Sequence, residues 1–168
     1  MYRFTEQDVI ELKKMAQQVR EDVVTMVHLA GSGHPGGSLS ATEIITALYF
    51  HVLNINPAEP KWPERDRFIL SKGHCCPAYY SALAHKGYFP VETLKTLRQY
   101  GSILQGHPDM LMTPGVDMTA GSLGNGLSIG VGMASSAILH KQSYTTYVLM
   151  GDGELQEGLN WEAAMAAS

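Results

Sequence analysis

The sequence predicts an α/β fold in which a parallel β-sheet is flanked by helices. Two short apolar segments, residues 67–71 and 145–150, have the composition of buried strands. Segments with helical spacing of apolar residues surround them, and this alternation is typical of parallel sheets with helical crossovers. The 17 glycines cluster in the loops, which indicates that the backbone there lies close to another group.

Capping residues and apolar spacing predict the helices before the first strand. Thr5 is expected to cap a helix that ends at the glycine-rich loop 31–37. A capping box at residues 40–43 predicts the start of a second helix. Residues 54–63 contain three prolines and are expected to form a loop.

Three helical segments are expected between the two strands. The first covers about residues 77–86 and is closed by Gly87, and the second covers about 90–100. An irregular loop, 106–121, follows. The helix expected over 123–140 carries four glycines, which suggests close packing against a ligand or the sheet.

The two ends of the chain carry further signals. Asn160 is predicted to cap a last helix, and no C-cap signal precedes Ser168. We therefore expect the domain to be incomplete at its C-terminus. The segment from Met1 to Glu6 lacks the apolar stretch of a signal peptide.

Length and composition indicate one folded domain over residues 1–168. The chain is 45% hydrophobic, whereas disordered segments are poorer in apolar residues. Its net charge of −4 argues against nucleic acid as a partner, and no apolar stretch reaches the roughly 18 residues of a membrane span. Cys75 and Cys76 are expected to be free packing residues in a reducing compartment. We therefore expect a cytoplasmic protein with no nucleic-acid or membrane partner.

The most specific chemical signal directly follows the second strand. It is the motif Gly151-Asp152-Gly153-Glu154-Leu155-Gln156-Glu157-Gly158. Asp152 would stand at the carboxyl edge of the sheet, where carboxylate oxygens can hold Mg²⁺ against a diphosphate. Asp-Gly is also a common turn pair, so a turn without a metal is the alternative.

Three histidines, His34, His74 and His107, each follow a glycine in a predicted loop. They are candidate catalytic groups because imidazole exchanges protons near neutral pH, although a single Gly-His pair is otherwise an ordinary loop feature. Arg67 and Lys72 are candidates for phosphate contacts or for a structural ion pair. The remaining histidines lie on predicted helices and are interpreted as structural or surface residues: His28, His51, His85 and His140.

Five segments resemble transketolase segments, in the order of that family. They are residues 32–37, 66–74, 106–108, 119–128 and 151–158. The resemblance extends from about residue 8 to residue 168. It implies a thiamine-diphosphate-binding fold, of which this chain would be the N-terminal, diphosphate-binding domain, without the family's pyrimidine-binding domain.

The resemblance implies a role for each motif residue. Asp152 would bind Mg²⁺, or Ca²⁺ or Mn²⁺ in its place, and His74 would approach the diphosphate and thiazolium of the cofactor. His34 and His107 would bond the sugar hydroxyls, and Glu157 would join a carboxylate network at the subunit interface. The implied cofactor-binding residues are His74, Gly121, Ser122, Leu123, Gly151, Asp152, Gly153, Glu154 and Glu157.

The implied activity is the transfer of a two-carbon ketol group from a ketose phosphate to an aldose phosphate. Thiamine diphosphate supplies the electron sink, and the histidines move the protons of the hydroxyls. A 1-deoxyxylulose-5-phosphate synthase would share Gly-Asp-Gly and is the runner-up, although the histidine motifs favour transketolase. A non-catalytic truncated paralogue that serves as a binding or assembly module is the other alternative.

By the same resemblance, the active site needs parts that residues 1–168 lack. These are a second metal ligand, a further histidine and the glutamate that activates the aminopyrimidine. We therefore expect the chain to be inactive alone and to work with a C-terminal subunit or domain that carries the pyrimidine-binding part. Either the gene is split, which the motifs favour, or the chain is a fragment; a homodimeric or heterotetrameric assembly is expected.

Overall fold

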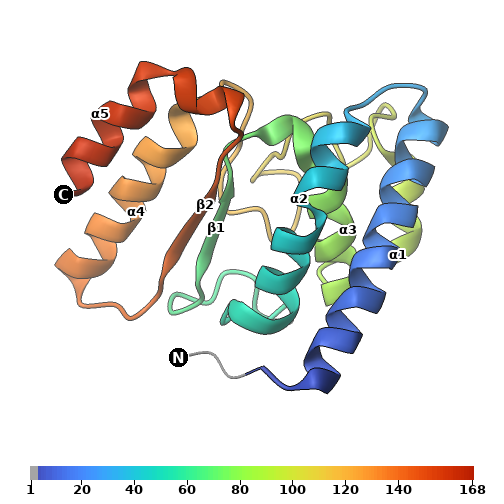
Figure 1. The fold of residues 1–168 in the computed structure, drawn as a ribbon, viewed down its shortest axis with the longest axis horizontal. Helices are drawn as coiled ribbons and strands as arrows, with labels where there is room; N and C mark the ends of the chain where they lie inside the picture. The colour runs from blue at the N-terminus through green and yellow to red at the C-terminus, as the bar shows by residue number, and fades with distance from the viewer. Residues whose placement is uncertain (1–3) are drawn as a thin grey trace.

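The computed structural model describes residues 4–168. Residues 1–3, at the start of the expected domain and of the segment without signal-peptide character, lie outside the described residues. Two strands lie between two groups of helices, with α1, α2 and α3 on one side and α4 and α5 on the other (Figure 1). This arrangement confirms an α/β fold with a parallel sheet flanked by helices.

The sheet consists of β1 (Arg67–Leu70) and β2 (Thr146–Leu149), which pair in parallel. Arg67 stands opposite Thr146 at one end of the ladder. Because a parallel pair cannot be joined by a tight turn, the connection runs through a helix, a long loop and a second helix. The carboxyl ends of both strands therefore lie at the same edge of the sheet.

The first group of helices comprises α1 (Glu6–Ala30), α2 (Pro35–Ala47) and α3 (Cys76–Lys86). Thr5 caps α1, as predicted, and the structure shows that it does so in a capping box with Asp8; Gly31 ends the helix in the left-handed conformation with φ 63°. All three helices pack against one another. They enclose the main hydrophobic core.

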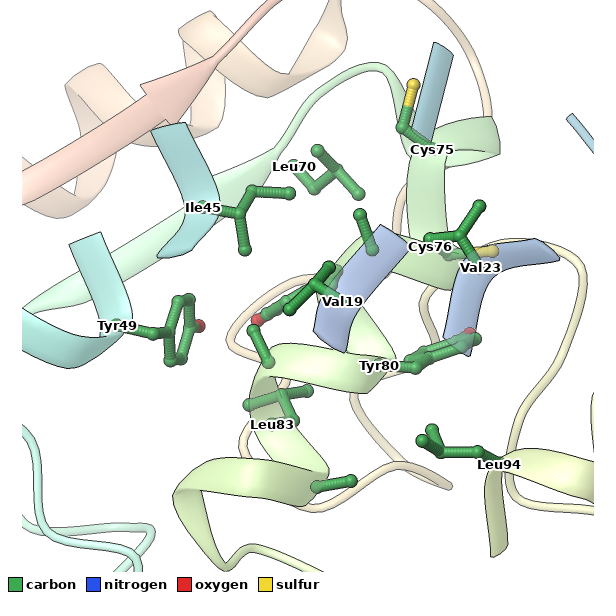
Figure 2. Close-up of a cluster of buried hydrophobic side chains, with 14 of the residues drawn as sticks. Val19, Val23, Ile45, Tyr49, Leu70, Cys75, Cys76, Tyr80, Leu83 and Leu94 are labelled. Atoms are coloured by element: carbon green, nitrogen blue, oxygen red, sulfur yellow. The ribbon is translucent and has the colours of Figure 1, made fainter. Parts of the chain in front are cut away.

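α3 lies at the centre of this core, and its residues from Cys76 to Ala84 are all buried. Figure 2 shows Tyr80 and Leu83 of α3 near Val19 of α1, within one buried apolar cluster. Both cysteines are buried and free, which confirms the packing role expected of them. β1 joins the same cluster through Phe68 and Leu70, while Ile69 between them points to the opposite face, toward α4.

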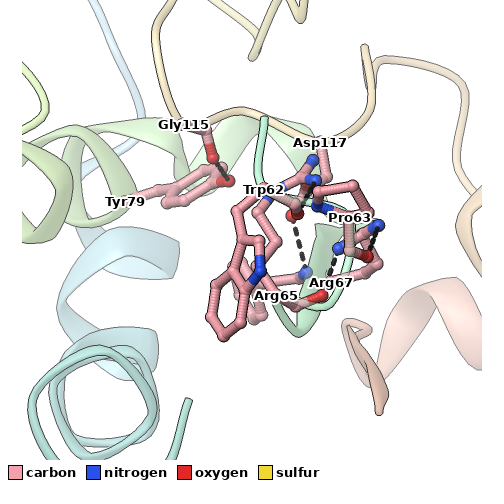
Figure 3. Close-up of polar contacts among 8 residues, drawn as sticks. Trp62, Pro63, Arg65, Arg67, Tyr79, Gly115 and Asp117 are labelled. Atoms are coloured by element: carbon pink, nitrogen blue, oxygen red, sulfur yellow. Dashed lines mark hydrogen bonds and ion pairs between the residues drawn. The ribbon is translucent and has the colours of Figure 1, made fainter. Parts of the chain in front are cut away.

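The long loop before α4 is fastened to the start of β1 (Figure 3). The carboxylate of Asp117, whose side chain is 7% exposed, accepts hydrogen bonds from Phe68 N at 2.9 Å and from Arg65 Nη2 at 2.5 Å. The hydroxyl of Tyr79 donates to the carbonyl of Gly115 at 3.1 Å. The loop is irregular, as predicted, but these contacts hold its second half in place.

Arg67 makes structural contacts, but they are not the ion pair with a carboxylate that the sequence predicted. Its guanidinium donates to the carbonyls of Arg65 and Pro63 (Figure 3) and lies over the Tyr144 ring, 4.2 Å from the ring centroid. The ion pair with Asp117 is formed by Arg65 instead.

The predicted start of the second helix is wrong. α2 begins at Pro35, so the residues of the expected capping box lie inside the helix, where Ser40 Oγ donates to the Gly37 carbonyl at 2.9 Å. Proline suits the first helical position because its φ is fixed near the helical value. A π-helical turn, Leu48–Val52, continues α2.

The helix predicted over 90–100 is also wrong in its extent. Only a 3₁₀ helix, Val91–Thr96, forms there. Thr96 Oγ1 bonds the Thr93 carbonyl at 2.7 Å, and Arg98 turns the chain with a φ of 60°. A side chain that bonds the local backbone competes with the helical ladder, and the positive φ stops its continuation.

Asn160 does not cap the last helix, contrary to prediction. α5 (Gly158–Ala167) already includes Asn160, and its buried side-chain amide donates to the Glu154 carbonyl at 2.6 Å. The other elements agree with prediction within one or two residues, including Gly87 as the C-cap of α3. Within residues 4–168, no helix has the length and apolar character needed to cross a bilayer.

The glycines of α4 (Asn125–His140) provide a test of how this helix packs. A Cβ on Gly130 would lie 2.5 Å from Val148 Cγ2, whereas a Cβ on Gly132 would meet no atom within 4 Å. We expect Gly130→Ala to destabilise the fold by about 1–3 kcal/mol through overpacking, and Gly132→Ala to stabilise it by about 0.5–1 kcal/mol through helix propensity. Urea unfolding measures both free energies. If both variants changed the free energy of unfolding in the same direction, the result would contradict the close packing of α4 on β2.

Candidate functional site

The residues that follow the two strands meet at the carboxyl edge of the sheet. Ser71 N donates to the Leu149 carbonyl at 3.0 Å, so the pairing extends past the end of β1. Each strand then leads into a short 3₁₀ helix, Gly73–Cys75 after β1 and Gly153–Gln156 after β2. Ligands of parallel α/β sheets bind at this edge.

A pocket of about 220 Å³ opens at this edge. Its walls come from the N-terminal turns of α2, the segments after both strands, and the segment just before α4. The lining residues are Gly37, Ser40, Lys72, His74, Cys75, Leu123, Gly151, Asp152, Gly153 and Glu154.

Two larger hollows lie elsewhere on the molecule. One, of about 510 Å³, lies along α1 and α2, and the other, of about 520 Å³, is lined by residues 110–117 together with Lys61 and Arg65. Neither has a histidine among its described lining residues, and neither lies at the carboxyl ends of the strands. The smaller pocket is therefore the candidate functional site.

The structure brings the three predicted catalytic histidines together. The rings of His34 and His74 meet edge to face, with their centroids 5.3 Å apart. Burial lowers the pKa of His74, and the nearby charges of His34, Lys72 and His107 lower it further. Burial also lowers the pKa of His107, with contributions from Arg98 and His34. His74 and His107 are therefore more strongly neutral at pH 7 than a free histidine.

Neighbouring side chains hold His107 through the backbone of its loop. The Tyr80 hydroxyl lies 2.9 Å from the Gln105 carbonyl and 3.0 Å from the His107 carbonyl. The Arg98 guanidinium packs on Gly106, where a Cβ would lie 3.0 Å from Arg98 Nε. A side chain at Gly106 would thus require the Arg98 guanidinium to shift by a few tenths of an ångström.

Asp152 presents an open carboxylate to the pocket. Its side chain is exposed and forms no hydrogen bond or ion pair with residues 4–168. A Cβ on Gly153 would meet no atom within 4 Å, so the space beside this carboxylate is free. The described residues contain no group of three or more His, Cys, Asp or Glu side chains that could hold a metal. Asp152 is therefore an unengaged carboxylate that is available to a cation or another ligand.

Glu154 differs sharply from Asp152, because its carboxylate is 2% exposed and fully engaged. One oxygen accepts from the Ser71 hydroxyl and, at 2.9 Å, from Gly124 N. The other oxygen accepts from Gly151 N at 2.9 Å. Glu154 thus joins three segments of the pocket wall.

The remaining predicted site residues lie at the margin of the pocket. Gly121 and Ser122 are exposed, and Leu123 lines the pocket just before α4. Glu157 is exposed, and its Cβ lies 2.9 Å from the position of a Cβ on Gly124, which has a φ of 88°. The structure gathers these residues near the pocket but supplies no partner for the Glu157 carboxylate among residues 4–168.

Four residues of this region were not singled out as site residues from the sequence: Gly37, Ser40, Ser71 and Cys75. A Cβ on Gly37 would lie 2.8 Å from Cys75 Sγ, which explains the need for glycine there. For Ser71 the sequence did offer a signal, because this residue stands at the end of a predicted strand, as Gly151 does. The contact partner of Gly37 lies too far away along the chain to be inferred from sequence.

The pocket combines groups that suit an anionic ligand held through a metal. Asp152 offers carboxylate oxygens to a cation, and Lys72 offers positive charge to phosphate oxygens. The neighbouring imidazoles are able to accept or donate protons. Such a set fits a diphosphate group placed beside a centre of proton transfer.

The sequence profile of the transketolase family, in its thiamine diphosphate binding domain, matches residues 11–168. The chain therefore belongs to the transketolase family and represents its N-terminal, thiamine-diphosphate-binding part.

Curated relatives carry the same family name. A 6-deoxy-6-sulfo-D-fructose transketolase subunit, SqwG, of Clostridium sp. (strain MSTE9) is 51% identical over 158 residues, which cover 94% of this chain and 58% of the relative. An apulose-4-phosphate transketolase subunit of Phocaeicola vulgatus is 48% identical over 157 residues, covering 94% and 56%. The chain thus spans little more than half the length of these relatives.

Solved transketolases share the fold. A Pichia stipitis variant crystallised with fructose 6-phosphate superposes with a TM-score of 0.87 at 39% identity, over 93% of this chain and 25% of that one. The Campylobacter jejuni enzyme gives 0.86 at 37% identity, over 93% and 26%. The expected thiamine-diphosphate-binding fold is therefore confirmed.

The electrostatic neighbours of the histidines make separate predictions for two variants. Removing the cation in Lys72→Met should raise the pKa of His74 and leave that of His107 unchanged, because Lys72 acts on His74 alone. Arg98→Met should raise the pKa of His107 and leave that of His74 unchanged. NMR titration of the imidazole resonances measures both. An equal response of the two histidines to either variant would contradict the described arrangement.

Proposed function

We propose that this chain is the N-terminal subunit of a two-polypeptide transketolase that depends on thiamine diphosphate and a divalent metal. It would transfer a two-carbon ketol group from a ketose phosphate to an aldose phosphate. The observation that carries this proposal is the open Asp152 carboxylate, which shares one pocket with Lys72 and His74 at the carboxyl edge of the sheet.

In this proposal, residues 1–168 form one diphosphate-binding domain. Asp152 binds Mg²⁺, or Ca²⁺ or Mn²⁺, and the turn from Gly151 through Gly153 to Glu154 faces the phosphate oxygens with Lys72. The free space beside Gly153 supports this role. The segment of Gly121, Ser122 and Leu123 faces the rest of the cofactor. Glu157 belongs to a carboxylate network with the partner.

The histidines of the pocket handle the sugar. Bound thiamine diphosphate supplies the electron sink for cleavage next to the ketose carbonyl. His34 and His107 bond the sugar hydroxyls and move the proton of the hydroxyl next to the cleaved bond. His74, whose ring contacts that of His34, would lie where the cofactor meets the sugar. The depressed pKa values of His74 and His107 support proton acceptance at neutral pH, since a neutral imidazole has a free lone pair.

The proposed partner is a second polypeptide that carries the pyrimidine-binding domain. Two relatives are named as transketolase subunits, which supports a divided enzyme. We propose a homodimeric or heterotetrameric assembly in the cytoplasm. This chain alone would be inactive.

The relatives' names also bear on the substrate. One is named for a sulfonated fructose and another for apulose 4-phosphate, both of which are ketoses with a terminal anionic group. We therefore propose a ketose of this kind as donor, with a sulfonate or a phosphate. A non-catalytic assembly module and a 1-deoxyxylulose-5-phosphate synthase are the alternatives that experiment must separate.

Native mass spectrometry of the protein purified from its own host tests the proposal as a whole. We expect a complex with a second polypeptide that carries thiamine diphosphate and a divalent metal. A chain without partner and cofactor would leave the assembly module as the explanation. Formation of deoxyxylulose phosphate by the complex would favour the synthase.

The metal role of Asp152 makes a direct prediction. Asp152→Ala should weaken Mg²⁺-dependent binding of thiamine diphosphate by roughly 100-fold or more, since even residues behind the metal ligands change metal affinity by about 10- to 100-fold. Isothermal titration calorimetry of the assembled complex measures this affinity. Glu162→Ala, an exposed position on α5, is the control and should bind as the unmodified protein does. Unchanged affinity in Asp152→Ala would remove the metal assignment.

The sugar-binding role predicts a different kinetic pattern for the histidines. His34→Ala and His107→Ala should lower kcat/KM for the ketose roughly 100- to 10,000-fold, while the affinity for the cofactor stays within about threefold. His140→Ala is the control, because His140 is exposed at the end of α4. Steady-state kinetics with saturating cofactor separates the two effects. A loss confined to cofactor binding would contradict a role at the sugar.

A further inference from the structure

Glu154 is the most completely buried carboxylate in the pocket wall, and the chemistry proposed above gives its side chain no task. It is 2% exposed and its two oxygens serve three donors. Burying a carboxylate is unfavourable unless hydrogen bonds compensate for the lost water. A buried carboxylate whose hydrogen bonds are satisfied in this way is a candidate for a structural or positioning role.

The three donors come from three of the four segments that form the pocket. Ser71 follows β1, Gly124 precedes α4, and Gly151 follows β2. The Ser71 hydroxyl also accepts from Gly126 N at 3.2 Å, so the network reaches the first turn of α4. One carboxylate therefore fixes how far apart these segments stand.

The backbone of Glu154 is held as firmly as its side chain. The buried amide of Asn160 donates to the Glu154 carbonyl at 2.6 Å. Close packing supports the same junction, since a Cβ on Gly126 would lie 2.3 Å from Ser71 Oγ. Neither end of the residue can therefore move without disturbing a neighbouring segment.

We propose that Glu154 is a positioning residue that sets the turn of Gly151, Asp152 and Gly153 for cofactor binding. The inference rests on the proposed function of this pocket. Glu154 acts through Gly151, whose N–H it holds, so that the adjacent Asp152 carboxylate points into the pocket. Because the segments are fixed before the ligand arrives, less binding free energy is lost to ordering them.

The contacts also indicate why Glu154 does not itself serve as the metal ligand. One of its oxygens already accepts two hydrogen bonds and the other accepts a third. Asp152, two residues earlier, is exposed and has no partner within residues 4–168. The two acidic residues of this turn thus have separate tasks, one toward the chain and one toward the ligand.

Glu154→Gln is a sharp test because the substitution keeps the shape of the side chain but leaves one acceptor oxygen. Gly124 N and Gly151 N are both donors, and they lie on different carboxylate oxygens. No orientation of an amide can accept from both, so one backbone N–H always faces an NH₂ group. The substitution therefore breaks the link between two segments without leaving a cavity.

The experiment uses the assembled two-polypeptide complex. We expect Glu154→Gln to weaken the apparent affinity for thiamine diphosphate with Mg²⁺ by roughly 10- to 100-fold, as for the loss of a hydrogen bond to a charged group. At saturating cofactor, kcat and the sugar KM should stay within about threefold of the unmodified enzyme. Glu162→Gln, an exposed carboxylate-to-amide change on α5, should alter neither quantity.

A general structural role would give another pattern, with kcat reduced even at saturating cofactor. That result, or an unchanged cofactor affinity in Glu154→Gln, would overturn the proposal.

If Glu154→Gln does not fold, Ser71→Ala decides, because it removes one donor to the carboxylate and should weaken cofactor affinity roughly 3- to 10-fold. Asp152→Ala is measured alongside. Loss of binding there with normal binding in Glu154→Gln would refute only this inference, whereas normal binding in Asp152→Ala would refute the metal role.

Discussion

The parallel pairing of β1 with β2 is the interaction on which the candidate site depends. It places the segments after both strands at one edge of the sheet. The hydrogen bond from Ser71 N to the Leu149 carbonyl extends the pairing by one residue, to the wall of the pocket. In an antiparallel pair these segments would lie at opposite ends. The small residues of α4 complete the arrangement, because Gly130 allows this helix to lie against β2.

His74 of the pocket and the neighbouring His34 and His107 are supported in two different ways. His34 leads directly into α2, and His74 lies between β1 and α3, so the hydrophobic core fixes both. His107 lies on a loop without regular structure and is held by polar contacts with the Tyr80 hydroxyl and by packing near Arg98. Rigid elements thus position two imidazoles, and a few specific contacts position the third.

The sequence was sufficient for features that depend on local pattern. Apolar composition located both strands, and Thr5, as a capping residue, located the start of α1. Prediction failed where a distant or competing contact decides the conformation. Asn160 has the residue type of a cap, yet its amide bonds the Glu154 carbonyl, and the box at 40–43 loses to the proline that starts α2. For the same reason, the sequence indicated Asp152 but not the buried network around Glu154, whose partners are separated by up to 83 positions.

α3 has no outward side over its first nine residues, since Cys76 to Ala84 are all buried. Substitutions there cannot be accommodated on a free face, so divergence among descendants of this chain should be slow at all nine positions rather than periodic. His74 lies two residues before this helix, in the 3₁₀ turn that leads into it, and should vary as little. Change around the pocket would then fall on its peripheral loops, while the buried helix remains a fixed reference for them.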